Sequence, residues 1–535
     1  MIFKYFRYLL FISILFITGT DIAMASQLHQ EDGIMPNQSA EYVRTLSRNA
    51  STDADAAFYN PAGTAFMKKK GLYLMFSSQT LYAKKDSSFR LWGVNPGGAG
   101  WRATTESGNP YFYTTNSKFL VPKSYPAEII APVLPDFDVV YKGENWAAFL
   151  SVAVTQAAPG LTFDNGTPDL DRAILLLNEA YATTLGQTLD RVVRKTYAKR
   201  TEQYLSGTIG GSYAFLNWLS AALGFRYIHA TGNQKVSQVP LDVTYSVALP
   251  SIRYPMLIDT DVNGFGHGII VGLDFKPLES LNIGIRAEYY LPMILKKNTK
   301  KFIAHPTVVQ SGQLNMFADS IWPMLLNDRL ADSVSTVGGV LNFLDMDPRT
   351  WKNIGNTIKV TYPPSLSVGL SYNIVKEFRI ETSVDLAFPN ARDIDGRENN
   401  FKDVSYRLGQ AVEWTIIPEV IVSAGYSYYD PGVKPEKRNE NDQLLTSHTV
   451  GGGFTIKPLD YLDITAGAFY MFYNPETTRD IDFAHSTLDI GIQITTTNGA
   501  GWDKKYRENR WSVALGVTGR FFGENAPGGA LTAKK

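Results

Sequence analysis

Hydrophobic and polar residues alternate along most of the chain from Gly71 onward. In the segment 378–388, Phe, Ile, Thr, Val, Leu and Phe alternate with Arg, Glu, Ser, Asp and Ala, and the segments 283–289 and 511–518 alternate in the same way. A period of two residues predicts β-strands with one apolar and one polar face. A soluble β-sandwich shares this pattern, but its strands average about 5–6 residues, whereas membrane strands need about 9–11. The longer runs found here favour a membrane barrel.

The alternating runs predict fourteen strands, an even number that suits a closed bacterial membrane barrel. We expect an all-β fold, namely a fourteen-stranded antiparallel transmembrane β-barrel. The predicted strands are 71–86, 136–143, 145–158, 201–216, 219–235, 261–276, 281–296, 357–374, 377–390, 401–416, 419–430, 445–457, 461–473 and 508–522.

The connections between these runs are alternately short and long. Tight turns follow even-numbered strands, as at 142–145, 276–279 and 457–460. Long connections follow odd-numbered strands, which is the asymmetry between periplasmic turns and extracellular loops in outer-membrane barrels. The expected outer loops are 87–135, 159–200, 236–260, 297–356, 391–400, 431–444 and 474–507.

The first 25 residues have the pattern of a secretory signal. Lys4 and Arg7 precede a short apolar stretch at 9–17, and Ala23-Met24-Ala25 supplies a cleavage site with small residues at both ends. We therefore expect export and cleavage, and a location in the outer membrane of a Gram-negative bacterium. The expected organisation is a signal peptide (1–25), a segment without strand periodicity (26–70), the barrel (71–522) and a flexible tail (523–535).

Composition narrows the function. The chain of 535 residues has 51 basic and 51 acidic residues and no cysteine, which argues against nucleic-acid binding and excludes thiol chemistry and cysteine-ligated metals. The six histidines show no metal-binding spacing, and no nucleophile elbow or phosphate-binding loop occurs. No apolar run reaches the roughly 18 residues that a membrane helix needs. We expect no enzyme activity, no cofactor and no bound metal.

The segment before the first strand carries a family resemblance. Asn60-Pro61-Ala62-Gly63 precedes the barrel, Tyr362-Pro363-Pro364 begins the eighth strand, and the segments 401–407 and 425–432 form a hairpin-like pair. In this order the features resemble the FadL/TodX family of outer-membrane transporters for long-chain fatty acids and other hydrophobic compounds. In that family an N-terminal hatch with an Asn-Pro-Ala motif precedes a fourteen-stranded barrel, so the resemblance implies that residues 26–70 form a hatch that plugs the barrel.

The resemblance implies passive uptake of a hydrophobic small molecule. Outer loops would capture the ligand, and a kinked third strand would release it sideways into the bilayer. The implied partners are that ligand and the outer-membrane lipid, including lipopolysaccharide, around a monomer. The candidate residues are Asn60, Pro61, Ala62 and Gly63 in the hatch, Pro159 and Gly160 at the kink of strand three, and Leu176, Leu189, Trp322 and Leu325 in apolar capture loops.

The chain also departs from the family pattern. The family hatch has several glycines before its Asn-Pro-Ala motif, but residues 40–59 contain none. Two other functions are also compatible with the sequence. One is a general diffusion porin, and the other is a surface adhesin or phage receptor that uses its outer loops. The sequence does not show whether the hydrophobic ligand is a fatty acid, an aromatic hydrocarbon or a terpenoid.

Overall fold

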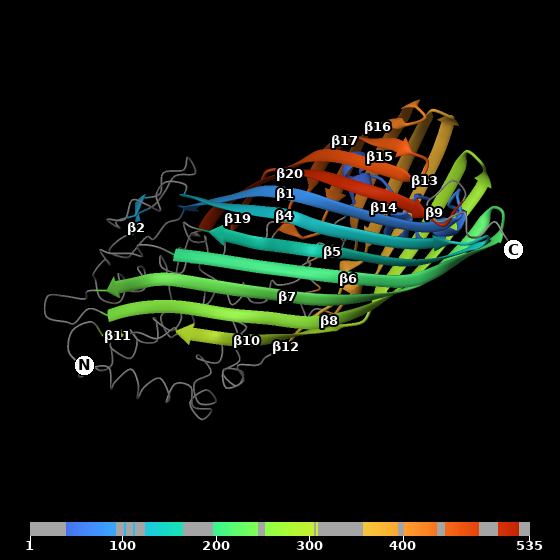
Figure 1. The fold of residues 1–535 in the computed structure, drawn as a ribbon. Helices are drawn as coiled ribbons and strands as arrows, with labels where there is room; N and C mark the ends of the chain where they lie inside the picture. The colour runs from blue at the N-terminus through green and yellow to red at the C-terminus, as the bar shows by residue number, and fades with distance from the viewer. Residues whose placement is uncertain are drawn as a thin grey trace.

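The described part of the chain forms a closed antiparallel β-barrel (Figure 1). The computed structural model describes residues 39–92, 101–102, 111–112, 123–163, 196–243, 252–303, 307–308, 357–393, 398, 401–435, 444–480 and 501–523. The predicted signal peptide, most of the predicted tail and the central parts of the long connections lie outside these residues.

The barrel wall has fourteen strands, as predicted. Two of them are interrupted: strand seven consists of β9 and β10, and strand eight consists of β12 and β13. In chain order the wall is β1 (Gly71–Trp92), β4 (Lys123–Lys142), β5 (Trp146–Phe163), β6 (Thr196–Leu216), β7 (Leu219–Val243), β8 (Ile252–Leu278), β9 (Leu281–Tyr290), β10 (Met293–Ile303), β12 (Thr357–Val360), β13 (Ser365–Val375), β14 (Phe378–Ala387), β15 (Ser405–Ile417), β16 (Val420–Asp430), β17 (Ser447–Leu459), β18 (Leu462–Tyr473) and β20 (Gly501–Phe521).

Each strand pairs with its neighbours in the chain, and β1 pairs with both β4 and β20, which closes the barrel. Short elements complete the described structure. They are the helices α3 (Ala40–Thr45) and α4 (Ala56–Tyr59), the 3₁₀ turns η1 (Pro61–Phe66) and η3 (Pro389–Ala391), and the small strands β2 (Trp101–Arg102), β3 (Tyr111–Phe112), β11 (Thr307–Val308) and β19 (Glu476–Asp480).

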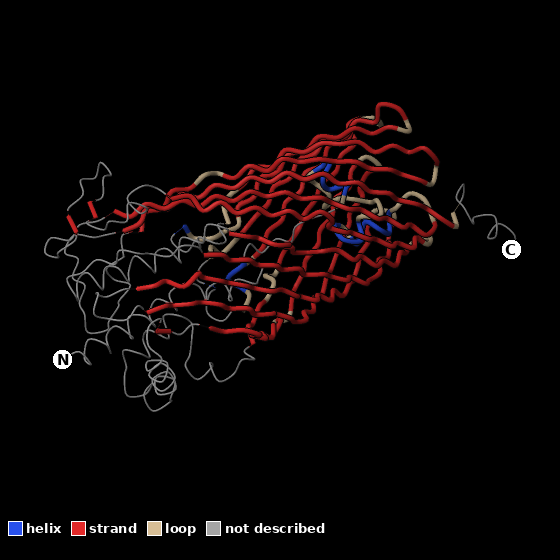
Figure 2. Tube along the Cα trace, turned by 60° about the vertical axis from the view of Figure 1, so that its left-hand side comes forward, coloured by secondary structure: helices blue, strands red, loops and turns tan. Residues whose placement is uncertain are grey.

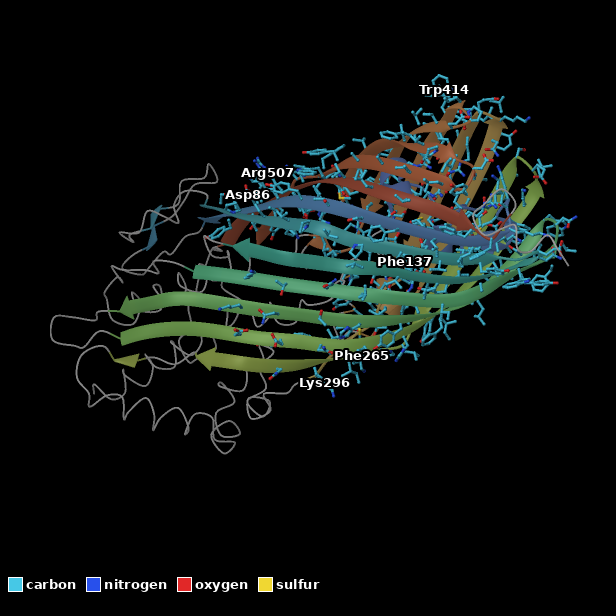
Figure 3. All side chains as sticks on the ribbon, viewed as in Figure 1. Asp86, Phe137, Phe265, Lys296, Trp414 and Arg507 are labelled. Carbon is cyan, nitrogen blue, oxygen red and sulfur yellow. The ribbon has the colours of Figure 1, made fainter. Side chains whose placement is uncertain are left out.

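Side chains alternate between a lipid-like exterior and a polar lumen. On β20, Trp511, Val513 and Leu515 face outward and are exposed, while Ser512 and Ala514 between them are buried. Figure 3 shows the same outward direction for Phe137 on β4 and Trp414 on β15. An exterior of large apolar side chains around a closed barrel is the surface expected of strands that span a bilayer.

The two ends of the barrel differ. At one end, here called the turn end, short turns join the strands at 143–145, 217–218, 279–280, 376–377, 418–419 and 460–461. At the opposite loop end, β1, β4 to β8, β10 and β20 extend past β13 to β17 (Figure 1). Asp86 and Arg507 are opposite each other on β1 and β20 in this extension (Figure 3).

Several predicted boundaries were wrong. Strand two begins at Lys123 rather than 136, so 123–135 is wall and not loop. Pro126, Pro132 and Pro135 interrupt the alternation there and hid the strand. The turns predicted at 276–279 and 457–460 are shorter, because β8 and β17 continue through Leu278 and Leu459.

Among the residues that the structure describes, no helix is both long enough and apolar enough to cross a membrane.

Candidate functional site: the plugged lumen

Residues 39–70, called the hatch from here on, fill the lumen nearer the turn end. Figure 2 shows the short helices inside the ring of strands. Helix α3 packs against β15 to β18, β20 and β1, α4 against β4 and β5, and η1 against β4 to β9. Ser39 caps α3 by accepting a hydrogen bond from the Tyr42 amide at 3.0 Å. The hatch therefore contacts strands around the barrel and forms a plug.

A buried ion cluster shapes the hatch from within. The Arg48 side chain is fully buried; its Nε donates to Asp55 at 2.7 Å and its Nη2 to Asp53 and Ser51 at 2.8 Å. Burial raises the pKa of Asp55, and the Arg48 guanidinium opposes that rise. Arg48 thus neutralises a carboxylate that has no access to water, and it holds the turn at 51–55 against the preceding chain.

The Asn-Pro-Ala-Gly motif lies where the hatch meets the wall. The Asn60 amide nitrogen donates to the Ser51 carbonyl at 3.0 Å and to the Asp274 carboxylate on β8. A side chain at Gly63 would place its Cβ 2.4 Å from the Ser51 carbonyl oxygen, so only glycine fits. The motif ties two hatch segments to one lumen carboxylate.

The other motif residues make the adjoining contact. Pro61 begins η1, where a missing amide hydrogen costs nothing. The Ala62 carbonyl accepts a hydrogen bond from the Ser220 hydroxyl at 2.8 Å, and the Thr64 and Ser212 hydroxyls are 2.7 Å apart. All four motif residues are buried against β6, β7 and β8.

Glycines on the wall replace the glycines missing from the hatch. A Cβ at Gly425 would lie 2.0 Å from the Thr45 carbonyl oxygen, and one at Gly369 would lie 2.3 Å from the Asn49 backbone. The hatch backbone can lie against the wall because the wall has no side chain at these points. The lumen glycines that the hatch backbone approaches in this way are Gly272, Gly284, Gly369, Gly409, Gly425, Gly451 and Gly467.

The hatch is held differently on its two sides. Toward β14 and β15, Arg44 pairs with Glu413 and Asn49 donates to Asp385 at 2.9 Å. Toward β4 and β5 the contact contains an apolar cluster, in which Ala57 and Met67 of the hatch pack with Val140, Ala147 and Phe149.

A small pocket lies on the loop-end side of the hatch. Its walls carry three arginines, Arg226, Arg286 and Arg407, and two carboxylates, Glu288 and Asp385, while Phe58 and Tyr59 of the hatch form part of its lining. The cavity measures about 20 Å³. Since one ordered water needs roughly 10–15 Å³, the cavity has room for a small polar group and none for an acyl chain.

The arginines are fixed in place by their neighbours. Arg226 donates to Thr208 at 2.8 Å, to the Tyr290 hydroxyl at 2.8 Å and to Glu288 at 3.1 Å. Its guanidinium lies 4.7 Å from the centre of the Phe58 ring. With three cations and two anions in its lining, the pocket has a positive excess of one charge.

The ladder between strands two and three is interrupted, although Ala131 and Leu134 of β4 still pack with Val154 of β5. Below the interruption Asp136 faces Ala153, and above it the next pair is Glu128 with Thr162, so 129–135 of β4 and 154–161 of β5 are not paired with each other. Pro159 and Gly160, predicted at a kink of strand three, fall in this stretch, and the register of β5 against β6 shifts between Pro159 and Leu161.

The remaining predicted site residues belong to the expected capture loops. Leu176, Leu189, Trp322 and Leu325 of the predicted capture loops lie outside the described residues.

Sequence reasoning missed the lumen partners of the hatch and the arginine pocket. A signal existed, because charged residues such as Arg226, Asp274 and Glu288 stand at strand positions whose neighbours are apolar. Their alternation identifies them as lumen-facing, but it does not say which of them meet.

Comparison with known proteins bears on the fold. No family model and no curated protein matches the sequence. Among solved structures, the barrel is similar to a FadL homologue from Pseudomonas aeruginosa, with a TM-score of 0.56 and 16% identity over 91% of this chain and 100% of that one.

Two toluene transporters resemble the chain more distantly. TodX from Pseudomonas putida has a TM-score of 0.49 and 10% identity over 92% of this chain and 100% of its own. TbuX from Ralstonia pickettii has a TM-score of 0.49 and 9% identity over 91% and 99%. At such low identity the likeness to the FadL homologue establishes only the fold. It confirms the hatch-plugged fourteen-stranded barrel that the sequence resemblance implies.

Proposed function

We propose that this protein is an outer-membrane transporter for the passive uptake of long-chain fatty acids or similar hydrophobic carboxylates. The loop end faces outward, the ligand head group binds in the arginine pocket above the hatch, and the ligand leaves sideways through the barrel wall. The observation that carries the proposal is the combination of a plugged lumen with an interrupted ladder between strands two and three.

The plug argues for a lateral route. A hydrophilic solute needs a continuous watery channel, whereas the hatch here is packed against the wall by buried ion pairs and by glycine contacts. A hydrophobic solute gains nothing from water, because each methylene group that stays hydrated costs about 0.8 kcal/mol. Lateral release into lipid avoids that cost.

The pocket argues for an anionic head group. Buried arginines bind carboxylates through charge-assisted hydrogen bonds, which are stronger than neutral ones. Since Arg226, Arg286 and Arg407 outnumber the two carboxylates of the lining, an added carboxylate would balance the local charge. A neutral hydrocarbon such as toluene, the compound that TodX and TbuX are described as transporting, would leave the charge of the pocket unbalanced.

The proposed opening between strands two and three lies at the apolar exterior. Ile130 and Val133 of β4 stand in the unpaired stretch and are 59% and 61% exposed. A molecule that passed between the strands here would enter an apolar environment directly.

The test closes this opening with an engineered disulfide. The protein has no cysteine, so a pair such as Pro135→Cys with Val154→Cys, at the next opposed positions above Asp136 and Ala153, is the sole thiol pair present. We expect cells that express the oxidised variant to lose most of their uptake of labelled hexadecanoic acid, and a reductant to restore it.

The matched control joins the same two strands where they are already paired, with Tyr141→Cys and Ala148→Cys. This disulfide should leave uptake unchanged. Uptake that survives closure of the opening, with the disulfide verified by mass spectrometry, would contradict lateral release between strands two and three.

A further inference from the structure

Strands seven and eight separate and rejoin in the same register. Glu288 of β9 faces Ser365 of β13 on the turn-end side, and Met293 of β10 faces Val360 of β12 on the loop-end side. Residues 289–292 and 361–364 lie between these pairs and do not pair with each other. Because no residue is inserted on either side, this break is a local parting of two strands and not a bulge.

Prolines keep the break open. Pro292 and Pro363 stand in the two facing segments, and neither has a backbone N–H to donate to the opposite strand. The N–H of Leu291 points to the other neighbouring strand, β8, where it donates to the His267 carbonyl at 3.0 Å. The ladder between strands seven and eight therefore lacks two of its donors here, even though the register continues across the break.

The break lies within the apolar exterior. The outward positions of strand seven, from Leu281 through Leu291 to Ile294, carry no charge, and the first charged one is Lys296 on β10, labelled in Figure 3. Leu291 is 56% exposed. In lipid, backbone without ladder partners is tolerated only where it is buried in protein or lines a cavity.

The facing segment of strand eight is turned into the protein. Thr361, Tyr362 and Pro363 are all buried, although alternate residues of a wall strand should be exposed. The Tyr362 ring packs against Tyr290, with ring centres 5.3 Å apart, in an apolar cluster that also contains Met293 and Val360.

The break adjoins the arginine pocket directly. Tyr290, Tyr362 and Pro363 belong to the break and also line the pocket. The pocket is too small for an acyl chain, so a ligand whose carboxylate sits beside Arg226 needs another place for its tail. An apolar tail that left the pocket between Tyr290 and Pro363 would pass through the break to the lipid.

We propose that the break between strands seven and eight is a tail-binding subsite and a second lateral opening, through which the acyl chain of a carboxylate held in the arginine pocket reaches the bilayer. This inference rests on the proposed function, because it assumes an amphiphilic ligand. It assigns a role to a part of the wall on the other side of the hatch motif from strands two and three.

The first experiment uses the unaltered protein in phospholipid vesicles. Hexadecanoic acid with a photoreactive diazirine at its methyl end is bound, irradiated, and the adducts are mapped by mass spectrometry. We expect adducts in 289–292 and 361–364 that excess unlabelled hexadecanoic acid removes. Adducts at lipid-facing positions of 281–287 should not be removed by this competition. Competable labelling confined to other parts of the protein would overturn the proposal.

The second experiment closes the break. Pro292→Cys and Thr361→Cys occupy the opposed positions next to Met293 and Val360, and Ile283→Cys with Leu370→Cys joins the same two strands where they are paired. We expect the oxidised break variant to lose most of its extra affinity for hexadecanoic over octanoic acid, while octanoic acid still binds. The control disulfide should leave both affinities unchanged.

The outcomes separate the two proposals. If the unaltered protein binds neither acid, the proposed function fails. If it binds both and closing the break leaves the preference for the longer acid intact, the proposed function stands and the tail subsite is wrong.

Discussion

Replacing Arg48 with methionine should unplug the barrel without unfolding it. Arg48 is fully buried and pairs with Asp55, whose side chain is also fully buried, at 2.7 Å. Its second partner, Asp53, has a side chain that is 61% exposed and gains little from the pair. Removing one member of a buried ion pair costs about 3–5 kcal/mol, because the other charge is left without compensation.

The cost falls on the hatch and not on the wall, since the strands are held by their own ladders. At about 1.4 kcal/mol per factor of ten, the equilibrium between seated and displaced hatch should shift by roughly a hundredfold to a few thousandfold. In planar bilayers the variant should show frequent open-channel events, while the unaltered protein stays closed to ions.

The pH dependence gives an internal check. Burial already raises the pKa of Asp55, and loss of the opposing Arg48 raises it further. Above that pKa the variant buries an uncompensated carboxylate, and below it the proton removes the charge, so open events should become rarer as the pH falls through the Asp55 pKa. Lys70→Met, which breaks an exposed pair with Glu144, serves as control and should stay closed. A closed, pH-insensitive Arg48 variant would refute the reasoning.

Three further predictions concern the hatch seat and the pocket. Gly425→Val should displace the hatch and raise ion conductance, because the new side chain overlaps the Thr45 carbonyl, whereas Gly207→Ala, with no atom within 4 Å of its Cβ, should not. Asn60→Ala should weaken hatch seating by about 1–3 kcal/mol, measured as faster protease cleavage of the hatch, because the buried Asp274 loses a donor; an unchanged cleavage rate would contradict this. Arg226→Gln should weaken binding of hexadecanoic acid about tenfold or more and leave hexadecanol unaffected, since a hydrogen bond to a charged group contributes about 1.5–3 kcal/mol; equal losses for both ligands in a binding titration would argue against a carboxylate site.

Much of the wall could be predicted from sequence because membrane strands obey a simple rule. Lipid on one side and a polar lumen on the other force an alternation that a single sequence displays, as on β20 and β14. The rule fails where prolines break the alternation. It placed the start of strand two near 136 instead of at Lys123, and it drew strands seven and eight as continuous across Pro292 and Pro363.

The candidate site was less predictable, because its contacts join residues far apart in the chain. The motif Asn60-Pro61-Ala62-Gly63 was visible in the sequence, but its partner Asp274 is 214 residues away from Asn60. The missing hatch glycines looked like a departure from the family pattern. Wall glycines such as Gly369 and Gly425 leave space for the hatch backbone instead, and only the folded barrel brings these glycines opposite the hatch.

The most direct test of the account compares ion flow with fatty-acid passage in one preparation. The purified protein is placed in planar bilayers for conductance, and cells with and without it are assayed for uptake of labelled hexadecanoic acid. The account predicts a barrel closed to ions whose deletion sharply reduces fatty-acid uptake. A barrel that conducts ions freely, and whose deletion leaves fatty-acid uptake unchanged, would contradict it and point to a diffusion porin.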